Sequence, residues 1–211
     1  MKATSRLPRS TILVSLLVFI AIAGMGASIA LTTDSYWVNW HMSRLGEGHS
    51  TASMIFNASL IAGAILLLLV SEKIRHEHWL AGKTTGMGTF SVLVSCVAMG
   101  WVGVALFPFD DFPVIHNIFG YGMFVSACIL MLGLTKISPH FSRKTYAIGT
   151  AAVLVTSIMM ALHHLIGLTS LLVVELIGEA MLFAWLFSVA SDSSKLSLTC
   201  SHSESAILVT D

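Results

Sequence analysis

The chain has 211 residues, of which 55% are hydrophobic and only 10% are Asp, Glu, Lys or Arg. A soluble domain carries roughly 25% charged residues, so this composition argues against a soluble enzyme and against a disordered chain. The 11 basic and 11 acidic residues cancel, which removes the positive field that a nucleic-acid partner would need.

A transmembrane helix needs roughly 20 consecutive apolar residues. The sequence has six such stretches and therefore predicts an all-α, polytopic membrane protein with one six-helix domain over residues 1–190. The predicted spans are Thr11–Leu31, Ile55–Ser71, Met87–Phe107, Ile115–Leu134, Ala147–Gly167 and Thr169–Ala190. The first stretch also has features of a cleaved signal peptide, but its apolar run exceeds the usual length of about 7–15 residues, so we expect a retained helix.

Basic residues fall almost entirely on one side of these predicted helices. If the N-terminus is cytoplasmic, ten of the eleven lie on that side and only Arg44 lies on the other. The ten are Lys2, Arg6, Arg9, Lys73, Arg75, Lys83, Lys136, Arg143, Lys144 and Lys195. The positive-inside rule predicts a plasma-membrane or inner-membrane protein, in contact with lipid, with both termini in the cytoplasm. Ser191–Asp211 is Ser-rich and lacks apolar periodicity, which predicts a disordered cytoplasmic tail.

Polar side chains gather at the outer ends of the predicted helices. The first two outer loops supply Ser43, His49, Asp110, Asp111 and His116. An Asp near the start of the fourth helix could instead cap that helix. Because these groups come from separate loops but lie at similar depth, they predict a pocket that opens outward, with the first loop as its lid.

The last two predicted helices add further ionisable groups. Glu175 and Glu179 lie one turn apart on one helix face, with Glu179 about 14 Å below the start of the helix, near the bilayer midplane. An ionised carboxylate there costs at least about 2.5 kcal/mol, so both should face a cavity or partners, or be protonated. His163 and His164 end the fifth helix, and the short link to the sixth predicts that one of them approaches Glu175.

These His and carboxylate groups are compatible with several chemistries. A divalent metal such as zinc is one. Its candidate ligands are His163, His164, His116 and Glu175. The same groups could act as an acid–base pair or a proton relay. A serine hydrolase built from Ser43, His49 or His116, and Asp110 is a further hypothesis, although no G-x-S-x-G elbow is present.

Four segments resemble a known family. They are SRLGEGHS (Ser43–Ser50), Phe56-Asn57, GWVGVALFPFDD (Gly100–Asp111) and His116-Asn117. Their order relative to the helices resembles the multi-span family called domain of unknown function 998. It is more loosely similar to the DRAM-like membrane proteins that include a GPI-anchor-remodelling factor. The resemblance, from Ser43 to about Trp185, implies a six-helix fold and motif positions at Ser43, Asn57, Asp110, His116, Asn117 and Glu175. The first family has no settled activity, and the looser one suggests lipid-linked chemistry or lipid handling.

We therefore expect an outward-facing His/carboxylate pocket that binds or processes a lipid head group or small ligand at the outer leaflet, with metal assistance as one option. Expected catalytic residues are His116, Asp110, Glu175 and Ser43, and expected ligand-binding residues are Asn57, Asp111, Asn117 and Glu179. The alternatives are a proton-coupled transporter that uses Glu179 and a non-catalytic structural subunit. A transporter needs a second pathway from the cytoplasm, and we expect no ionisable residue along the inner halves of the helices.

Overall fold

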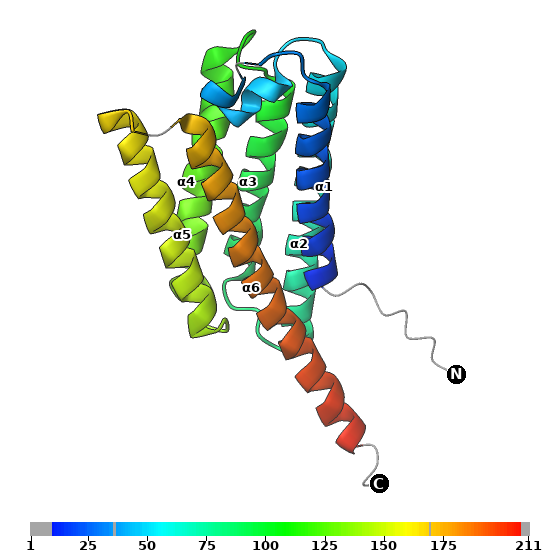
Figure 1. Ribbon diagram of the computed structural model, residues 1–211. Helices are drawn as coiled ribbons and strands as arrows, with labels where there is room; N and C mark the ends of the chain where they lie inside the picture. Colours follow the sequence, from blue (N-terminus) through cyan, green and yellow to red (C-terminus); the bar gives the residue numbers. More distant parts are fainter. Residues whose placement is uncertain (1–9, 36, 169, 208–211) are drawn as a thin grey trace.

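The computed structural model describes residues 10–35, 37–168 and 170–207. Over these residues it has six long helices and no β-strand (Figure 1). They are α1 (Ser10–Leu31), α2 (Thr51–Leu80), α3 (Met87–Leu106), α4 (Pro113–Ile137), α5 (Arg143–Ala161) and α6 (Leu171–Ile207). All six helices contain an apolar segment long enough to cross a membrane, which confirms the all-α, six-span fold. The predicted start of the sixth span, Thr169, lies outside the described residues, as do residues 1–9 and 208–211.

Successive helices pack side by side. α1 packs on α2, α2 on α3, and α3 on α4, while α6 lies against α1, α2 and α5. α5 stands at the edge of the bundle, where it contacts α4 and α6 (Figure 1). The α1–α2, α3–α4 and α5–α6 connections lie at one end of the bundle, the upper end in Figure 1. The α2–α3 and α4–α5 connections lie at the lower end.

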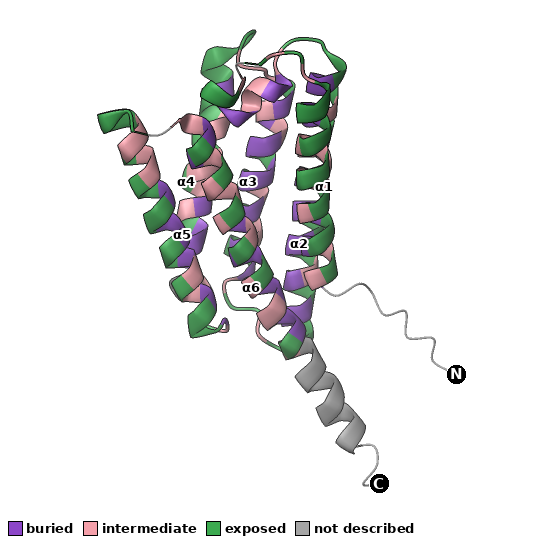
Figure 2. Cartoon of the chain, in the orientation of Figure 1, coloured by how far each residue is buried: buried purple, intermediate pink, exposed green. Residues whose placement is uncertain are grey.

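The buried residues line the interior of the bundle, and exposed ones cover its outer faces (Figure 2). Trp185 and Phe90 are fully buried, whereas the Phe19 side chain is 67% exposed. An apolar side chain is stable on that outer surface when the surroundings are lipid. At Gly103 a Cβ would collide with the Phe119 ring of α4, so the close contact of α3 with α4 requires a residue without a side chain.

α2 is longer than its apolar run, which predicted Ile55–Ser71. Its first turn is capped by Ser50, whose Oγ accepts a hydrogen bond from the Ser53 N–H at 3.1 Å. At its other end the helix runs to Leu80, so that Glu77 and His78 lie inside it and are buried. The expectation that no ionisable residue lines the inner halves of the helices is therefore wrong.

α6 also extends further than expected. The sequence predicted a disordered tail from Ser191, but the helix continues to Ile207. Asp192 accepts a hydrogen bond from the Ser142 N–H at 2.8 Å, and Ser193 is fully buried. This part of α6 packs through polar contacts with α5 and α1, which a search for apolar periodicity does not detect.

One group of buried polar residues lies at the lower end, and we call it the lower cluster: Ser10, Lys73, Glu77 and Ser194. The Ser10 hydroxyl lies 2.8 Å from one Glu77 oxygen and 3.0 Å from the Ser194 hydroxyl. The other Glu77 oxygen accepts from the Ser10 N–H at 3.4 Å and faces Lys73 Nζ at 3.8 Å. Both carboxylate oxygens are thus partnered, and the cluster ties α1 to α2 and α6.

Candidate functional site

The chain between α1 and α2 closes the upper end with two short 3₁₀-helices, η1 (Trp37–Asn39) and η2 (Met42–Gly46). α6 holds η2 on one side, where the Glu175 carboxylate accepts a hydrogen bond from the Met42 N–H. α2 holds it on the other, where Asn57 Nδ2 donates to the Gly46 carbonyl at 2.9 Å. A Cβ at Gly46 would collide with Asn57, so this contact requires glycine. Asn57, for which ligand binding stays a prediction, supports η2 through this bond.

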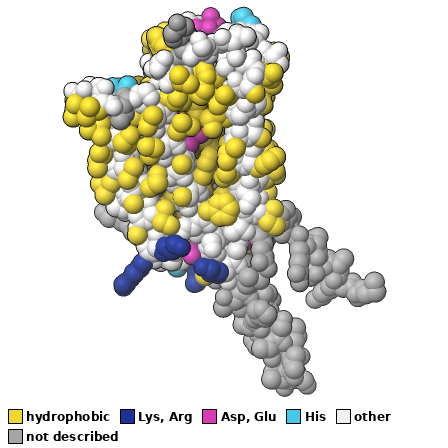
Figure 3. Space-filling view, viewed as in Figure 1, with side chains coloured by type: hydrophobic (Ala, Val, Ile, Leu, Met, Phe, Trp, Pro, Cys, Tyr) yellow, Lys and Arg dark blue, Asp and Glu magenta, His cyan; other side chains and the backbone are white. Residues whose placement is uncertain are grey.

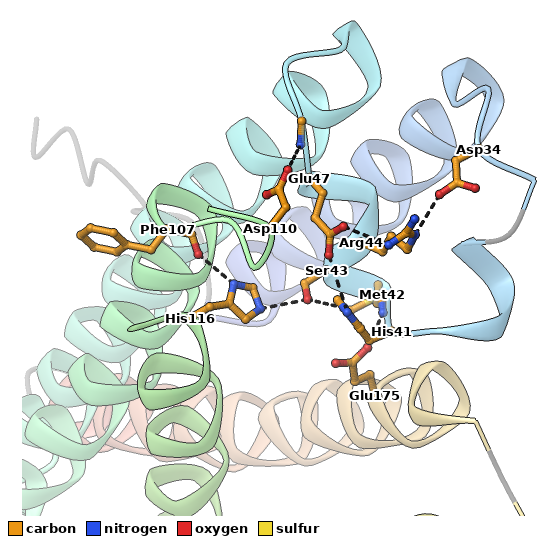
Figure 4. A network of polar contacts seen from close by, with 11 residues as sticks. Asp34, His41, Met42, Ser43, Arg44, Glu47, Phe107, Asp110, His116 and Glu175 are labelled. Atoms are coloured by element: carbon orange, nitrogen blue, oxygen red, sulfur yellow. Dashed lines mark hydrogen bonds and ion pairs between the residues drawn. The ribbon is translucent and has the colours of Figure 1, made fainter. Parts of the chain in front are cut away.

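η2 brings Ser43 to His116 of α4 (Figure 4). Ser43 Oγ lies 3.0 Å from His116 Nε2, and His116 Nδ1 lies 2.8 Å from the Phe107 carbonyl oxygen. A carbonyl oxygen only accepts, so Nδ1 carries a proton, and Nε2 of the neutral ring accepts the Ser43 hydroxyl. A hydroxyl bonded to a base that a third group orients is the arrangement of an activated nucleophile.

His41 makes the second contact with Ser43. Its Nδ1 lies 2.8 Å from Ser43 Oγ. Because the single hydroxyl proton of Ser43 points to His116, His41 Nδ1 is the donor in this bond. The lone pair on His41 Nε2 then faces Glu47 Oε1 at 3.6 Å. Both of these atoms are buried, and neither has a hydrogen-bond partner among the described residues.

The electrostatic surroundings match this proton arrangement. Burial, followed by the neighbouring charges of His116 and Arg44, lowers the pKa of His41 to about 4. Burial raises the pKa of the Glu47 carboxyl above its usual value, although Arg44 opposes the shift. His41 is therefore neutral near pH 7, and its Nε2 lone pair faces a carboxyl group whose protonated form is favoured by burial.

Arg44 completes a continuous polar chain from the Phe107 carbonyl to Asp34 (Figure 4). Its guanidinium donates to Glu47 Oε2 at 3.2 Å and to Asp34 Oδ2 at 2.8 Å. We call the chain of side chains the upper cluster: Asp34, His41, Ser43, Arg44, Glu47 and His116.

The α3–α4 connection contributes an aromatic ring rather than an acid. Phe109 packs edge-on between the rings of His41 and His116, at centroid distances of 5.3 and 5.7 Å. Asp110 accepts a hydrogen bond from the Gly48 N–H at 3.0 Å, and Asp111 is exposed. His116 is therefore oriented by a backbone carbonyl, where the serine-hydrolase hypothesis placed Asp110.

Two further alternatives for these loops are not realised. α4 starts after Phe112 with a proline in its first turn and no side-chain cap, so neither Asp caps it as we had considered. His49, the other candidate base, is exposed.

A cavity of about 380 Å³ lies below the upper cluster. Its polar lining residues are His41, Ser43, His116, Asn117, Tyr121, Thr156, Glu175 and Glu179. Deeper in the bundle its walls are mainly apolar, with Leu60, Trp101, Phe124, Val153 and Met160 among them. The structure thus brings together five of the ten predicted site residues around this cavity: Ser43 from η2, His116 and Asn117 from α4, and Glu175 and Glu179 from α6.

Glu179 faces cavities on two sides. It lines the large cavity and also a small one that Ala21, Ser59 and Gly63 help to form. The space-filling view shows an acidic side chain inside a hollow of the hydrophobic belt (Figure 3). Glu179 thus faces cavities, as its depth in the membrane requires.

His163 and His164 lie elsewhere, in η3 (Leu162–Ile166), a π-helical turn that continues α5. Their rings contact each other at 4.8 Å, and neither side chain is among the described residues that line the cavity. Glu175, which we expected one of them to approach, accepts a hydrogen bond from the Met42 N–H. Within the described residues, no group of three or more His, Cys, Asp or Glu is arranged to hold a metal ion. The wider π-turn changes the direction of the side chains relative to a continued α-helix.

The predicted set lacked four side chains of the upper cluster, Asp34, His41, Arg44 and Glu47, and it also lacked Phe109 and the Phe107 carbonyl. His41 had a sequence signal, because it lies two residues before Ser43 in a loop rich in ionisable residues. The carbonyl had none, because every residue has one.

A model of the family described as protein of unknown function (DUF998) matches residues 13–192. No match was found among curated proteins or among solved structures. The matched region runs from α1 into the extended part of α6 and contains every residue of the upper cluster.

Proposed function

The chain belongs to the DUF998 family, whose function is unknown, so we propose a function from the site itself. We propose that the cavity of about 380 Å³ binds a membrane lipid, with the lipid head group beside Ser43, His116 and Glu175. The acyl chain lies against the apolar walls. One observation carries this proposal: in a largely apolar cavity most polar lining residues come from the upper end, whereas Glu179 and Thr156 lie deeper. That distribution matches an amphiphile better than a polar solute.

We place this site at the outer leaflet of the cell membrane, with both termini in the cytoplasm. Lys and Arg side chains gather at the lower end in Figure 3. The chain places Lys73 in the lower part of α2, Lys83 in the α2–α3 connection and Lys144 at the lower start of α5, whereas Arg44 belongs to the upper cluster. The positive-inside rule supports a cytoplasmic lower end.

Cysteine labelling in intact cells tests this orientation. A membrane-impermeant maleimide should modify an Asp111→Cys variant directly, and a Lys83→Cys variant only after the cells are permeabilised. The unsubstituted protein gives the background from its own cysteines. The reverse pattern would place the site at the inner leaflet.

A proton-coupled transporter that uses Glu179 is less well supported. Transport requires access from both sides, but the lower cluster bonds the polar groups of α1, α2 and α6 to one another. Proton flux in liposomes that disappears in a Glu179→Gln variant would favour the transporter. A structural subunit would instead lose assembly on polar substitution while ligand binding stays unchanged.

Filling the cavity tests the lipid proposal directly. Gly120 lines the cavity, and a Cβ there meets no atom within 4 Å. A Gly120→Leu variant should therefore lower photo-crosslinking to a diazirine-labelled phosphatidylglycerol in vesicles about tenfold, the equivalent of about 1.4 kcal/mol. Gly122→Leu is the matched control, because Gly122 is exposed on the same helix, also has open space, and is not in the cavity lining. Equal crosslinking of the two variants and the unsubstituted protein would refute the proposal.

A further inference from the structure

We infer that Ser43 is a nucleophile and His116 its general base in the hydrolysis of an ester-linked acyl chain of a membrane lipid. The inference rests on the proposed function, because the substrate is the lipid held in the cavity. It goes beyond that function by assigning a reaction to the polar end of the site.

The hydrogen bonds around Ser43 orient its hydroxyl for this reaction. The Phe107 carbonyl fixes the proton of His116 on Nδ1 and leaves Nε2 as an acceptor 3.0 Å from Ser43 Oγ. The His41 Nδ1–H donates to Oγ from another direction at 2.8 Å. The Ser43 proton therefore points to the atom that would remove it.

The surroundings also restrict movement of the base. His116 is only 7% exposed, and the Phe109 ring packs edge-on against it. Ser43 is held indirectly through η2, which Glu175 and Asn57 attach to α6 and α2. Glu175 is thus a positioning residue, because it bonds to the residue next to Ser43.

The cavity brings an ester to this pair. Ser43 and His116 both lie in its polar lining, and its remaining walls are largely apolar. An acyl chain in the apolar part places its ester carbonyl at the polar end. A reacting pair at the mouth of an apolar chamber selects substrates that carry a hydrocarbon chain.

The reaction has two balanced steps. Ser43 Oγ attacks the ester carbonyl carbon while its proton passes to His116 Nε2, and the C–O bond to the lipid alcohol breaks as that alcohol takes the proton. A water molecule from the aqueous side then attacks the acyl-serine ester. Its proton passes through His116 back to Ser43 Oγ, and the fatty acid leaves.

An alkyl fluorophosphonate tests the nucleophile. Ser43 Oγ would form a bond to phosphorus and the P–F bond would break, with fluoride leaving and the proton going to His116. A dodecyl fluorophosphonate should label the intact protein on Ser43, as shown by mass spectrometry of the peptide. Ser43→Ala should abolish this label, and His116→Asn should slow it by at least about a hundredfold, because a positioned base contributes roughly 10²–10⁴ in rate. Ser59→Ala is the control, because Ser59 lines only the small cavity and should leave labelling unchanged.

Fatty-acid release from phosphatidylglycerol vesicles gives the second measurement. The unsubstituted protein should release fatty acid, and Ser43→Ala should not, although it should still crosslink to the diazirine lipid. Labelling at another residue, or release that persists in Ser43→Ala, would overturn the inference while lipid binding stands. Crosslinking that is insensitive to Gly120→Leu would instead refute the lipid-binding proposal.

Discussion

The lower and upper clusters, both made of buried and half-buried polar side chains, lie at opposite ends of the bundle and differ in what surrounds them. In the lower cluster the carboxylate of Glu77 is bonded through both oxygens to serine and lysine partners. In the upper cluster the facing atoms of His41 and Glu47 have no hydrogen-bond partner among the described residues. The upper cluster also borders the large cavity, whereas no residue of the lower cluster is in the lining of that cavity.

This difference separates a structural role from a functional one. Buried polar groups that satisfy each other stabilise helix contacts in an apolar environment. A serine between two histidines at the edge of a cavity adds little to helix packing, but it can react with a molecule that enters. Substitutions in the lower cluster should therefore lower the stability of the protein, whereas substitutions in the upper cluster should mainly lower ligand binding and reaction.

The largest effect on stability is expected at the lower cluster. Glu77→Ala leaves Ser10 and Lys73 without their buried partner and should lower the free energy of unfolding by about 3 kcal/mol. Denaturation of the purified protein in detergent measures this. The same variant should crosslink to the diazirine lipid as the unsubstituted protein does. Lost crosslinking with unchanged stability would contradict the division between the clusters.

A pH effect on stability is expected at the upper cluster. The pKa of His41 is about 4 in the folded chain, against an ordinary value of 6.5 that the unfolded chain keeps. Between these two pH values the unfolded chain binds a proton at His41 that the folded chain does not bind. Acid therefore favours unfolding over this window, by about 3 kcal/mol at most. Glu47 has the opposite effect on the pH dependence of stability. Because its pKa is raised in the folded chain, protonated Glu47 stabilises the fold at low pH, and this contribution is lost as the pH rises above 4.5.

Two variants isolate the His41 contribution. Glu47→Gln removes the opposing group and should lose stability between pH 6.5 and 4, whereas a Glu47→Gln, His41→Gln double variant should lose less. Subtracting the unfolding free energy of one variant from that of the other at each pH removes the contributions of the other groups around His41. These groups are Asp34, Arg44, Asp110, His116 and Glu175. Identical pH dependence in the two variants would show that His41 is not held neutral.

A smaller effect is expected at Glu175. Glu175→Ala removes the acceptor for the Met42 N–H and should slow fluorophosphonate labelling of Ser43 about tenfold, because η2 is no longer tied to α6. Glu175→Gln keeps an oxygen that can accept this bond and should restore most of the rate. If the Gln variant is as slow as the Ala variant, the charge of Glu175 matters rather than its hydrogen bond.

The smallest effect is expected at Asp110. Its bond to the Gly48 N–H is exposed, so Asp110→Asn should change stability by less than about 1 kcal/mol. Labelling of Ser43 should change less than about twofold. A hundredfold loss would make Asp110 the acidic partner of His116 and contradict the assignment of that role to the Phe107 carbonyl.

The sequence predicted the helices far better than it predicted the contacts of the site. Long apolar runs determine spanning helices by themselves, so the largest differences are the polar extensions of α2 and α6, with smaller ones at the ends of α4 and α5. Ser43, His116 and Glu175 were correctly placed at one end, because the alternating direction of the helices decides this.

Contacts between individual side chains depend on information that the sequence does not display. His116 pairs with a backbone carbonyl, and the fold of η2 decides which atom Ser43 meets. The short link after α5 suggested that His163 or His164 reaches Glu175, but both lie in a π-turn, and neither is in the lining of the cavity that Glu175 borders. Local backbone geometry, rather than composition, determined these outcomes.

The central claim is that an acyl chain in the large cavity leads to a reactive Ser43, and a comparison of two probes tests it most directly. Labelling rates of Ser43 are measured with dodecyl and with methyl fluorophosphonate, in the unsubstituted protein and in Gly120→Leu. We expect the dodecyl probe to react at least about tenfold faster in the unsubstituted protein, and this advantage to disappear when leucine fills the cavity while the methyl rate stays the same. If the ratio of the dodecyl rate to the methyl rate is the same in the unsubstituted protein and in Gly120→Leu, the claim is contradicted.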